Sequence, residues 1–403
     1  MRTVVFAAVA LAVYGAMHMG FYLRVRVLLP AEVRIVLAGF MVLLLFCPFA
    51  AMLFSSSGLN ATAAAAAVPG YLWMGFLFLA VCAGLAVRAW DLAAISLDRM
   101  VSLGIPRADP RSAAFFVLGA ALFGSVWGLV ENRLLFTTTV TVPTRLLAPG
   151  EKPLVAAYIS DLHLGPTNRP ELTRRVAEKV RQARPDVILC GGDLVDTHAP
   201  DLLQSAEILR GLSAPLGKYA VLGNHEAYYG VEQAEAYLRS CGFTLLGGKT
   251  ASPGNLLFLV GVDDPATGRP DRSGELLSVP GAKGRLPLVL RHRPQVPKAS
   301  AERFALQLSG HTHGGQILPF HLAVALFYPR LAGRYETPWG GAVVTCRGTG
   351  SWGPPMRILS PREVLVVRFV PEKAAMEPLA EETLLPGQKE PMVNQRESLE
   401  KTA

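Results

Sequence analysis

Four long apolar segments near the N-terminus are the strongest constraint on how this chain folds. They cover residues 3–23, 35–54, 65–87 and 113–130, and each approaches the roughly 20 residues that a helix needs to cross a bilayer. A cleavable signal peptide is the alternative for the first segment, but only Arg2 precedes it and no A-x-A cleavage site leads into a polar segment. We therefore predict an all-α transmembrane section of four helices within residues 1–139.

Arginines beside these segments predict their orientation. The connection after the first segment is flanked by Arg24, Arg26 and Arg34, whereas residues 55–64 carry no charge. Further arginines lie in or beside the third connection, namely Arg88, Arg99, Arg107 and Arg111. Because basic loops stay in the cytoplasm, the N-terminus and everything after residue 130 are expected on the other side. This predicts a multi-pass protein of the cell membrane with an extracytoplasmic globular part.

The net charge of +8 also raises the possibility of a nucleic-acid partner. Several of the arginines that produce it lie next to predicted spans, where they fix topology and meet anionic lipid headgroups. We therefore expect the membrane, and no nucleic acid, as a partner. The sequence gives no prediction of an oligomeric state.

The composition changes after the apolar segments. Residues 140–153, with three prolines and a glycine, are typical of a linker. Residues 154–370 alternate short β-branched runs with helical patterns, which predicts an α/β domain. The strands are expected at 155–160, 187–190, 219–222, 256–262, 286–290, 304–308, 342–345 and 364–369, and the helices at 171–183, 202–212 and 231–240. Residues 371–403 are polar and Glu-rich, and are predicted to form a disordered tail.

Polar residues follow five of the predicted strands. These blocks are Asp161-Leu162-His163, Gly191-Gly192-Asp193-Leu194-Val195-Asp196, Gly223-Asn224-His225-Glu226, His292, and Gly310-His311-Thr312-His313-Gly314-Gly315-Gln316. Ligand sites of open α/β sheets collect at the carboxyl ends of their strands. The five blocks therefore predict one common site.

The residue types in these blocks predict a divalent metal. Carboxylate, imidazole and amide oxygen favour ions such as Mn, Fe or Zn, and the absence of thiolate argues against an iron–sulfur site. The i, i+2 spacing of Asp161 with His163, and of His311 with His313, places both side chains of each pair on one side of an extended segment. The neighbouring glycines permit the sharp turns that aim such pairs at one point.

The ordered set D-x-H, G-D-x-x-D, G-N-H-E, H and G-H-x-H resembles the calcineurin-like metallophosphoesterase superfamily over residues 150–370. The Gly310–Gln316 block and the stretch from Arg347 to Arg357 resemble its bacterial membrane-associated branch. The resemblance implies a four-layer α/β sandwich of two mixed β-sheets flanked by helices. It also implies metal-dependent hydrolysis of a phosphodiester, phosphomonoester or pyrophosphate.

The resemblance further implies the role of each block. The first ion would be held by Asp161, His163 and His313, the second by Asn224, His292 and His311, and Asp193 would bridge them. Such a pair of ions clamps a phosphoryl group and lowers the pKa of a shared water. His225 would protonate the leaving oxygen or stabilise the phosphoryl oxygens, and Asp196 would orient His225.

Five other polar residues are expected to be structural. Glu226 and Gln316 lie within the blocks, His198 and His321 lie near them, and His18 lies in the first apolar segment. Arg291 and Arg293 flank His292 and either bind phosphate or face solvent.

Hydrolysis of a soluble phosphoester has three alternatives. A tether beside the bilayer makes a lipid-linked phosphoester a candidate substrate. A non-catalytic metal-binding sensor or scaffold is the alternative from another class, and the completeness of the blocks disfavours it. A transporter is disfavoured because the four spans carry no internal charges that would form an ion pathway.

Overall fold

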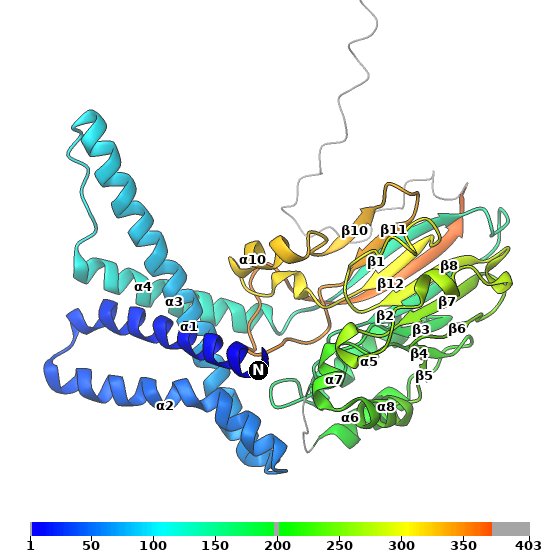
Figure 1. Cartoon of the computed structure of the whole chain (residues 1–403), viewed down its shortest axis with the longest axis horizontal. Coiled ribbons are helices and arrows are strands. Elements are labelled where there is room, and N and C mark those ends of the chain that lie inside the picture. Colours follow the sequence, from blue (N-terminus) through cyan, green and yellow to red (C-terminus); the bar gives the residue numbers. More distant parts are fainter. Residues whose placement is uncertain (1, 197–200, 373–403) are drawn as a thin grey trace, which may run out of the picture.

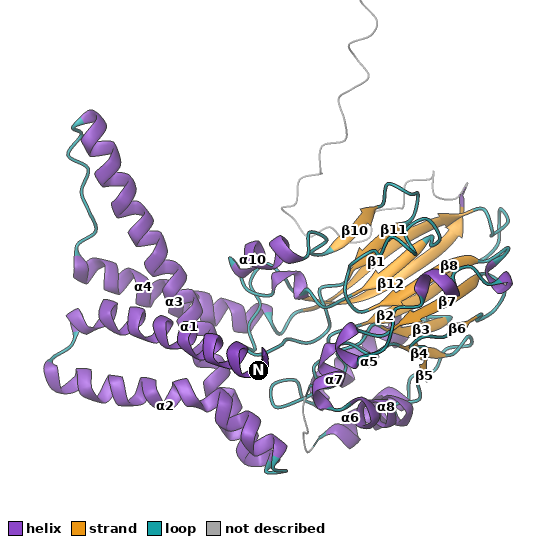
Figure 2. Ribbon diagram, in the orientation of Figure 1, coloured by secondary structure: helices purple, strands orange, loops and turns teal. Residues whose placement is uncertain are grey.

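The computed structural model describes residues 2–196 and 201–372. Its N-terminal section contains α1 (Arg2–Val25), α2 (Ala31–Ser56), α3 (Asn60–Val101) and α4 (Pro110–Glu131), and its globular part lies beside one end of this section (Figures 1 and 2). All four helices are long and apolar enough to cross a membrane, which confirms the predicted set. α3 is longer than expected, because residues 88–101 carry four charges but are rich in helix-forming Ala, Leu and Arg.

The globular part contains two mixed sheets of six strands each. The first has the order β1-β12-β2-β3-β4-β5, formed by Leu135–Thr144, Arg362–Pro371, Leu154–Ile159, Val187–Cys190, Lys218–Ala220 and Thr244–Leu245. The second has the order β10-β11-β9-β8-β7-β6, formed by Gly333–Glu336, Ala342–Thr345, Leu306–Ser309, Leu286–Arg291, Leu257–Val262 and Thr250–Ala251. The strands β2, β3, β4 and β5 run parallel to one another, as do β7, β8, β9 and β11.

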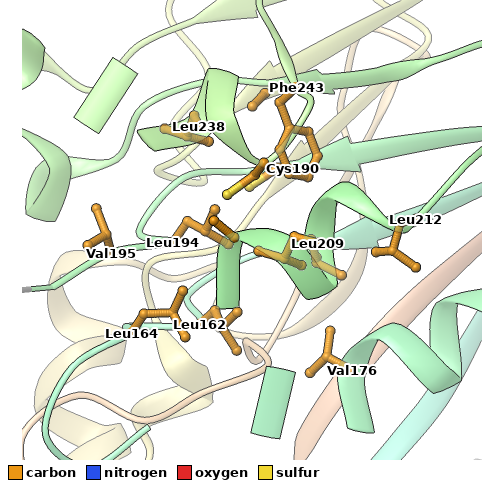
Figure 3. Packing of buried hydrophobic residues seen from close by; sticks show 14 of the residues in the cluster. Leu162, Leu164, Val176, Cys190, Leu194, Val195, Leu209, Leu212, Leu238 and Phe243 are labelled. Atoms are coloured by element: carbon orange, nitrogen blue, oxygen red, sulfur yellow. The ribbon is translucent and has the colours of Figure 1, made fainter. Parts of the chain in front are cut away.

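Helical layers cover the outer faces of both sheets. α5 (Pro170–Gln182), α6 (Leu202–Arg210) and α8 (Val231–Ser240) pack on the first sheet through buried residues such as Val176, Leu209 and Leu238 (Figure 3). The second sheet is covered by shorter pieces, including α9 (Ser273–Leu276) and the 3₁₀ turn Pro280–Ala282. A second apolar core fills the space between the sheets. The predicted four-layer α/β sandwich is confirmed.

β1 differs from the sequence prediction. Residues 140–144 were expected to begin a linker, but they belong to this strand, which pairs in parallel with β12. Pro143 suggested a linker because proline cannot donate a ladder hydrogen bond. An edge strand tolerates proline, and β1 is at the edge of its sheet. The expected boundary at residue 139 therefore falls inside a strand.

Two sequence predictions fall largely or wholly outside the described residues. The predicted tail, 371–403, overlaps them only at residues 371 and 372. His198 lies in the gap between residues 196 and 201.

α3 and α4 pack directly on the loop of residues 346–361, which connects β11 to β12. The Arg357 N–H donates to the Gly128 carbonyl of α4 at 2.9 Å. Gly75 of α3 leaves room for Met356, since a Cβ at Gly75 would lie 2.7 Å from the Met356 sulfur. The buried Glu131 carboxylate, at the end of α4, accepts the backbone N–H groups of Leu359 and Ser360 at 3.0 and 2.7 Å. The helical section and the globular part thus share a packed interface.

Glu131→Ala is expected to lower the stability of the full chain in detergent by about 2–4 kcal/mol, because two backbone N–H groups lose their buried acceptor. The thermal unfolding midpoint measures the effect. Glu178→Ala, at an exposed position on α5, is the matched control and should stay within about 0.5 kcal/mol of the wild type. Equal midpoints for the two variants would show that this contact does not hold the parts together.

Candidate metal centre

The segments that follow β2 and β3 run side by side and alternate between core and site. The N–H groups of His163 and Leu164 donate to the carbonyls of Asp193 and Leu194, each at 3.0 Å. Leu162 and Leu164 are buried in the core beneath α5 and α6 (Figure 3). Asp161 and His163 point away from that core toward His313, whose Nε2 lies 3.6 Å from the Asp161 carboxylate and 3.0 Å from Nε2 of His163. Local packing thus directs the two polar side chains to the opposite side.

Asp161, His163 and His313 form the first cluster. Nε2 of His163 lies 3.0 Å from Nε2 of His313, which in turn lies 3.6 Å from the Asp161 carboxylate. One ligand atom of each residue lies within 4.8 Å of the others. These are the three residues predicted to hold the first ion.

Asp193, His292 and His311 form the second cluster. Nε2 of His292 lies 3.0 Å from Oδ2 of Asp193 and 3.2 Å from Nδ1 of His311. Nδ1 of His292 donates to the Gly191 carbonyl at 2.8 Å, which directs Nε2 into the cluster. Asp193 also groups with His163, whose Nε2 lies 3.8 Å from Oδ2. Asp193 therefore lies between the two clusters.

Asn224 supplies an amide oxygen without a protein partner. It is the first residue of α7 (Asn224–Tyr229), and its buried Oδ1 accepts no hydrogen bond from the described residues. Buried polar atoms are almost always satisfied, and a bound cation would satisfy this one. Together with the carboxylates and imidazoles of the two clusters, it fits a centre for borderline or hard divalent ions.

The backbone around the site is strained at the candidate ligands. Positive φ angles of 55°, 48°, 51°, 72° and 51° occur at Asp161, His163, Asp193, His311 and His313. Such conformations are uncommon outside glycine, and they cluster where function needs a fixed geometry. Gly310 permits the close approach of two blocks, because a Cβ there would lie 2.1 Å from Asp161 Oδ2.

Glu226 holds the loop that carries Asp193. Its buried carboxylate accepts the N–H groups of Asp193, Leu194, Val195 and Gly223 at 2.6–3.2 Å. These four contacts agree with the structural role expected for Glu226. They also fix the position of the residue that lies between the two clusters.

Glu226→Gln is expected to weaken Mn²⁺ binding by about 10- to 100-fold, because residues that orient a ligand have effects of that size. Isothermal titration of the purified full chain measures the affinity. The matched control is Glu232→Gln, at an exposed position on α8. If both variants bound Mn²⁺ as the wild type does, the loop would not depend on this carboxylate.

His225 lies at the edge of the clusters and is held by Asp196. Its Nδ1 donates to the Asp196 carboxylate, and its backbone N–H donates to Asp193 Oδ1 at 2.8 Å. The imidazole meets the His163 ring edge-on, with centroids 4.6 Å apart. On its other side lies the exposed Trp352 ring, at 5.9 Å. The orienting contact predicted for Asp196 is therefore present.

The protein surroundings give these imidazoles different charges. Burial alone would lower the pKa of His225, but the Asp193 and Asp196 carboxylates raise it to about 9. Burial and the neighbouring His292 lower the pKa of His311 to about 3. Burial, with His163 and Arg357 nearby, also holds the pKa of His313 well below its usual range. His311 and His313 are thus neutral, which is the form that binds a metal, whereas His225 carries a proton.

Arg291 and Arg293 are paired with carboxylates. Arg291 contacts Asp271 at 2.8 Å, and Arg293 contacts Asp264 at 2.5 and 2.9 Å. These ion pairs favour structural roles over the phosphate binding considered for both residues.

Among the remaining residues with expected structural roles, Gln316 and His18 have partners, whereas the buried Nδ1 of His321 accepts or donates no hydrogen bond among the described residues. Gln316 donates to the carbonyls of Trp352 and Pro354 and so braces its turn. His18 accepts a hydrogen bond from Trp73 at 2.8 Å.

Two residues beside the clusters were not assigned a role from the sequence. The fully buried Arg357 lies with Nη2 3.1 Å from His313 Nδ1, and the Tyr328 hydroxyl lies 3.0 Å from His311 Nε2. Arg357 lies within a stretch that resembles the family, and this resemblance could have identified it as a residue of the site. Tyr328 follows an apolar helix, and no motif marked it.

The calcineurin-like phosphoesterase family matches residues 155–315 of the chain. An uncharacterized metallophosphoesterase of Aquifex aeolicus (strain VF5) is 34% identical over 256 residues, which are 62% of this chain and 96% of that protein. A relative from Helicobacter pylori (strain J99 / ATCC 700824) is 32% identical over 56% of this chain, which spans only 62% of that relative's length. The blocks from Asp161 to His313 lie inside the region that matches the family.

A relative from Bos taurus named transmembrane protein with metallophosphoesterase domain is 31% identical over 315 residues, covering 73% of this chain and 71% of that protein. Among solved structures, a dimetal phosphatase from Danio rerio is 15% identical with a TM-score of 0.37, covering 51% of this chain and 90% of that one.

Proposed function

The chain belongs to the calcineurin-like phosphoesterase family, a metal-dependent hydrolase family, and we propose from this membership that it hydrolyses a phosphoester or pyrophosphate at a centre of two divalent ions. The observation that carries the proposal is the convergence of the two clusters on Asp193. Mn, Fe and Zn all suit the donor set.

The ligands would divide between the two ions as the clusters do. Asp161, His163 and His313 would hold one ion, Asn224, His292 and His311 would hold the other, and Asp193 would contact both. The ions, when bound, polarise the phosphoryl oxygens and lower the pKa of the attacking water. The unpaired Asn224 oxygen and the His292 orientation support this division.

His225 would act on the leaving group. As the bond from phosphorus to the leaving oxygen breaks, the proton on His225 would pass to that oxygen. The Asp196 carboxylate supports this role because, at Nδ1, it raises the pKa of His225 and so favours the protonated imidazole. Asp196, which accepts from Nδ1, would keep Nε2 aimed at the substrate.

The four apolar helices associate the protein with a membrane. We propose that it is a multi-pass protein of the cell membrane whose catalytic part faces away from the cytoplasm, as the loop arginines suggest. Alkaline phosphatase or a fluorescent protein fused after residue 372 tests this topology. Phosphatase activity supports it, and fluorescence without phosphatase activity contradicts it.

The activity is tested on the full chain, since a truncation at residue 154 would remove the edge strand β1. Purified protein in detergent should hydrolyse bis-p-nitrophenyl phosphate with Mn²⁺, lose activity on chelation and regain it when Mn²⁺ is returned. Turnover that survives chelation, or no turnover by folded protein without bound metal, would contradict the proposal.

A further inference from the structure

α10 (Phe320–Phe327) is an apolar helix that stays largely exposed. Its sequence, FHLAVALF, contains no charged residue, and none of its residues is buried. Leu322, Leu326 and Phe327 are 62%, 82% and 76% exposed. Contiguous exposed apolar surface normally marks an interaction site.

α10 continues the apolar surface of the transmembrane section. The Phe320 ring packs edge-on against Phe78 of α3, with centroids 6.0 Å apart. Phe78 falls within residues 65–87, the apolar segment that is long enough to cross a bilayer. In Figure 1, α10 lies on the side of the globular part that faces α3 and α4. The helix is therefore level with residues whose natural surroundings are lipid.

Both ends of α10 adjoin the Gly310–Gln316 block of the metal centre. At its start, a Cβ added to Gly315 would lie 2.3 Å from His321 Cα, so the helix packs on the block that carries His313. Just after its end, the Tyr328 hydroxyl lies 3.0 Å from His311 Nε2. Because α10 is fixed to this block, any surface that contacts its exposed face lies at a fixed distance from the metal centre.

α3 packs on the loop that carries Trp352. A Cβ added to Gly75 of α3 would lie 3.2 Å from the Cβ of Pro354. Trp352, which contacts His225, is 53% exposed. Aromatic residues of this kind are typical of the boundary between lipid and water. His225 and the α3 segment around Gly75 thus contact the same loop.

We propose that α10 lies in the interface of the bilayer beside α3, with Leu322, Leu326 and Phe327 among the lipid chains. Because the helix borders the metal centre, the substrate is an amphiphilic phosphoester whose phosphate lies at headgroup level. The substrate class rests on the proposed function, whereas the insertion of α10 does not. A second copy of the chain would also cover an apolar face, but the continuity with α3 favours lipid.

Depth-dependent quenching tests the insertion. In the full chain with Cys47 and Cys82 replaced by alanine, the other native cysteines are buried, so a fluorophore can be placed on Leu326→Cys. The control is Leu146→Cys, a leucine that is 45% exposed just beyond the far end of β1. Ten residues of strand place it roughly 30 Å from the end of α4.

In nanodiscs of phosphatidylcholine and phosphatidylglycerol, brominated lipid should quench the label at residue 326 and iodide should not. The label at residue 146 should show the reverse. Quenching by iodide at both positions would overturn the inference. Protection of residue 326 from both quenchers would also overturn it, because it would indicate a protein contact.

Catalysis tests the substrate class separately. The wild type should have a KM for vesicle-borne dodecyl p-nitrophenyl phosphate lower than that for methyl p-nitrophenyl phosphate by on the order of ten-fold or more. Leu326→Glu should remove this difference. No hydrolysis of either ester would contradict the proposed function. Hydrolysis of both with equal KM, or an unchanged difference in Leu326→Glu, would contradict the membrane-borne substrate alone.

Discussion

Asp193→Asn is expected to lower kcat/KM for bis-p-nitrophenyl phosphate by more than about a hundred-fold. Loss of a residue that only orients a metal ligand already costs about 10- to 100-fold, and Asp193 is itself the residue between both clusters. Asparagine keeps the shape of the side chain but removes the charge that offsets two cations. Mn²⁺ content by elemental analysis should fall together with the rate.

Asp271→Asn is the matched control for this substitution. Asp271 is a partly exposed carboxylate that pairs with Arg291 outside both clusters. It should leave the Mn²⁺ content and the rate near those of the wild type. If Asp193→Asn bound as much Mn²⁺ as this control and turned over as fast, Asp193 would not join two ions.

His225→Ala is expected to lower kcat by about 10²- to 10⁴-fold, the usual contribution of a positioned proton donor, while the bound Mn²⁺ is retained. The reason is that His225 lies beside the clusters and is held by Asp196. The loss should be smaller for a p-nitrophenyl ester than for a phenyl ester, because p-nitrophenolate leaves without a proton. Steady-state rates on the two esters measure the difference.

Two other results would change the interpretation of His225. Equal losses on both esters would show that His225 stabilises the phosphoryl oxygens and does not protonate the leaving group. A cellular phenotype that survived both His225→Ala and Asp193→Asn would favour the non-catalytic sensor or scaffold.

Much of the architecture could be predicted because its signals are local. The four apolar helices follow from segment length, and β3, α8 and β11 appear at the residues where apolar pattern predicted them. β1 could not be recognised, because Pro143 is acceptable only at a sheet edge and edge position is a tertiary property. The short strands β5 and β6 contain two residues each, too few for a periodic pattern.

The residues of the site could also be predicted in part from local sequence. Motif order identified the blocks, and the structure brings Asp161 together with His313 although 152 positions separate them. The contacts of Tyr328 and Trp352 depend on how two later loops fold over the clusters, which no local pattern reveals. For the same reason, the apolar residues of α10 could not be distinguished in sequence from an ordinary core helix.

Anomalous diffraction from crystals of the full chain loaded with Mn²⁺ tests the central claim most directly. Two peaks about 3.5–4 Å apart, with the Asp193 carboxylate between them, are predicted. One ion should lie against Asp161, His163 and His313, and the other against Asn224, His292 and His311. A single peak, or peaks away from Asp193, would contradict the two-ion centre.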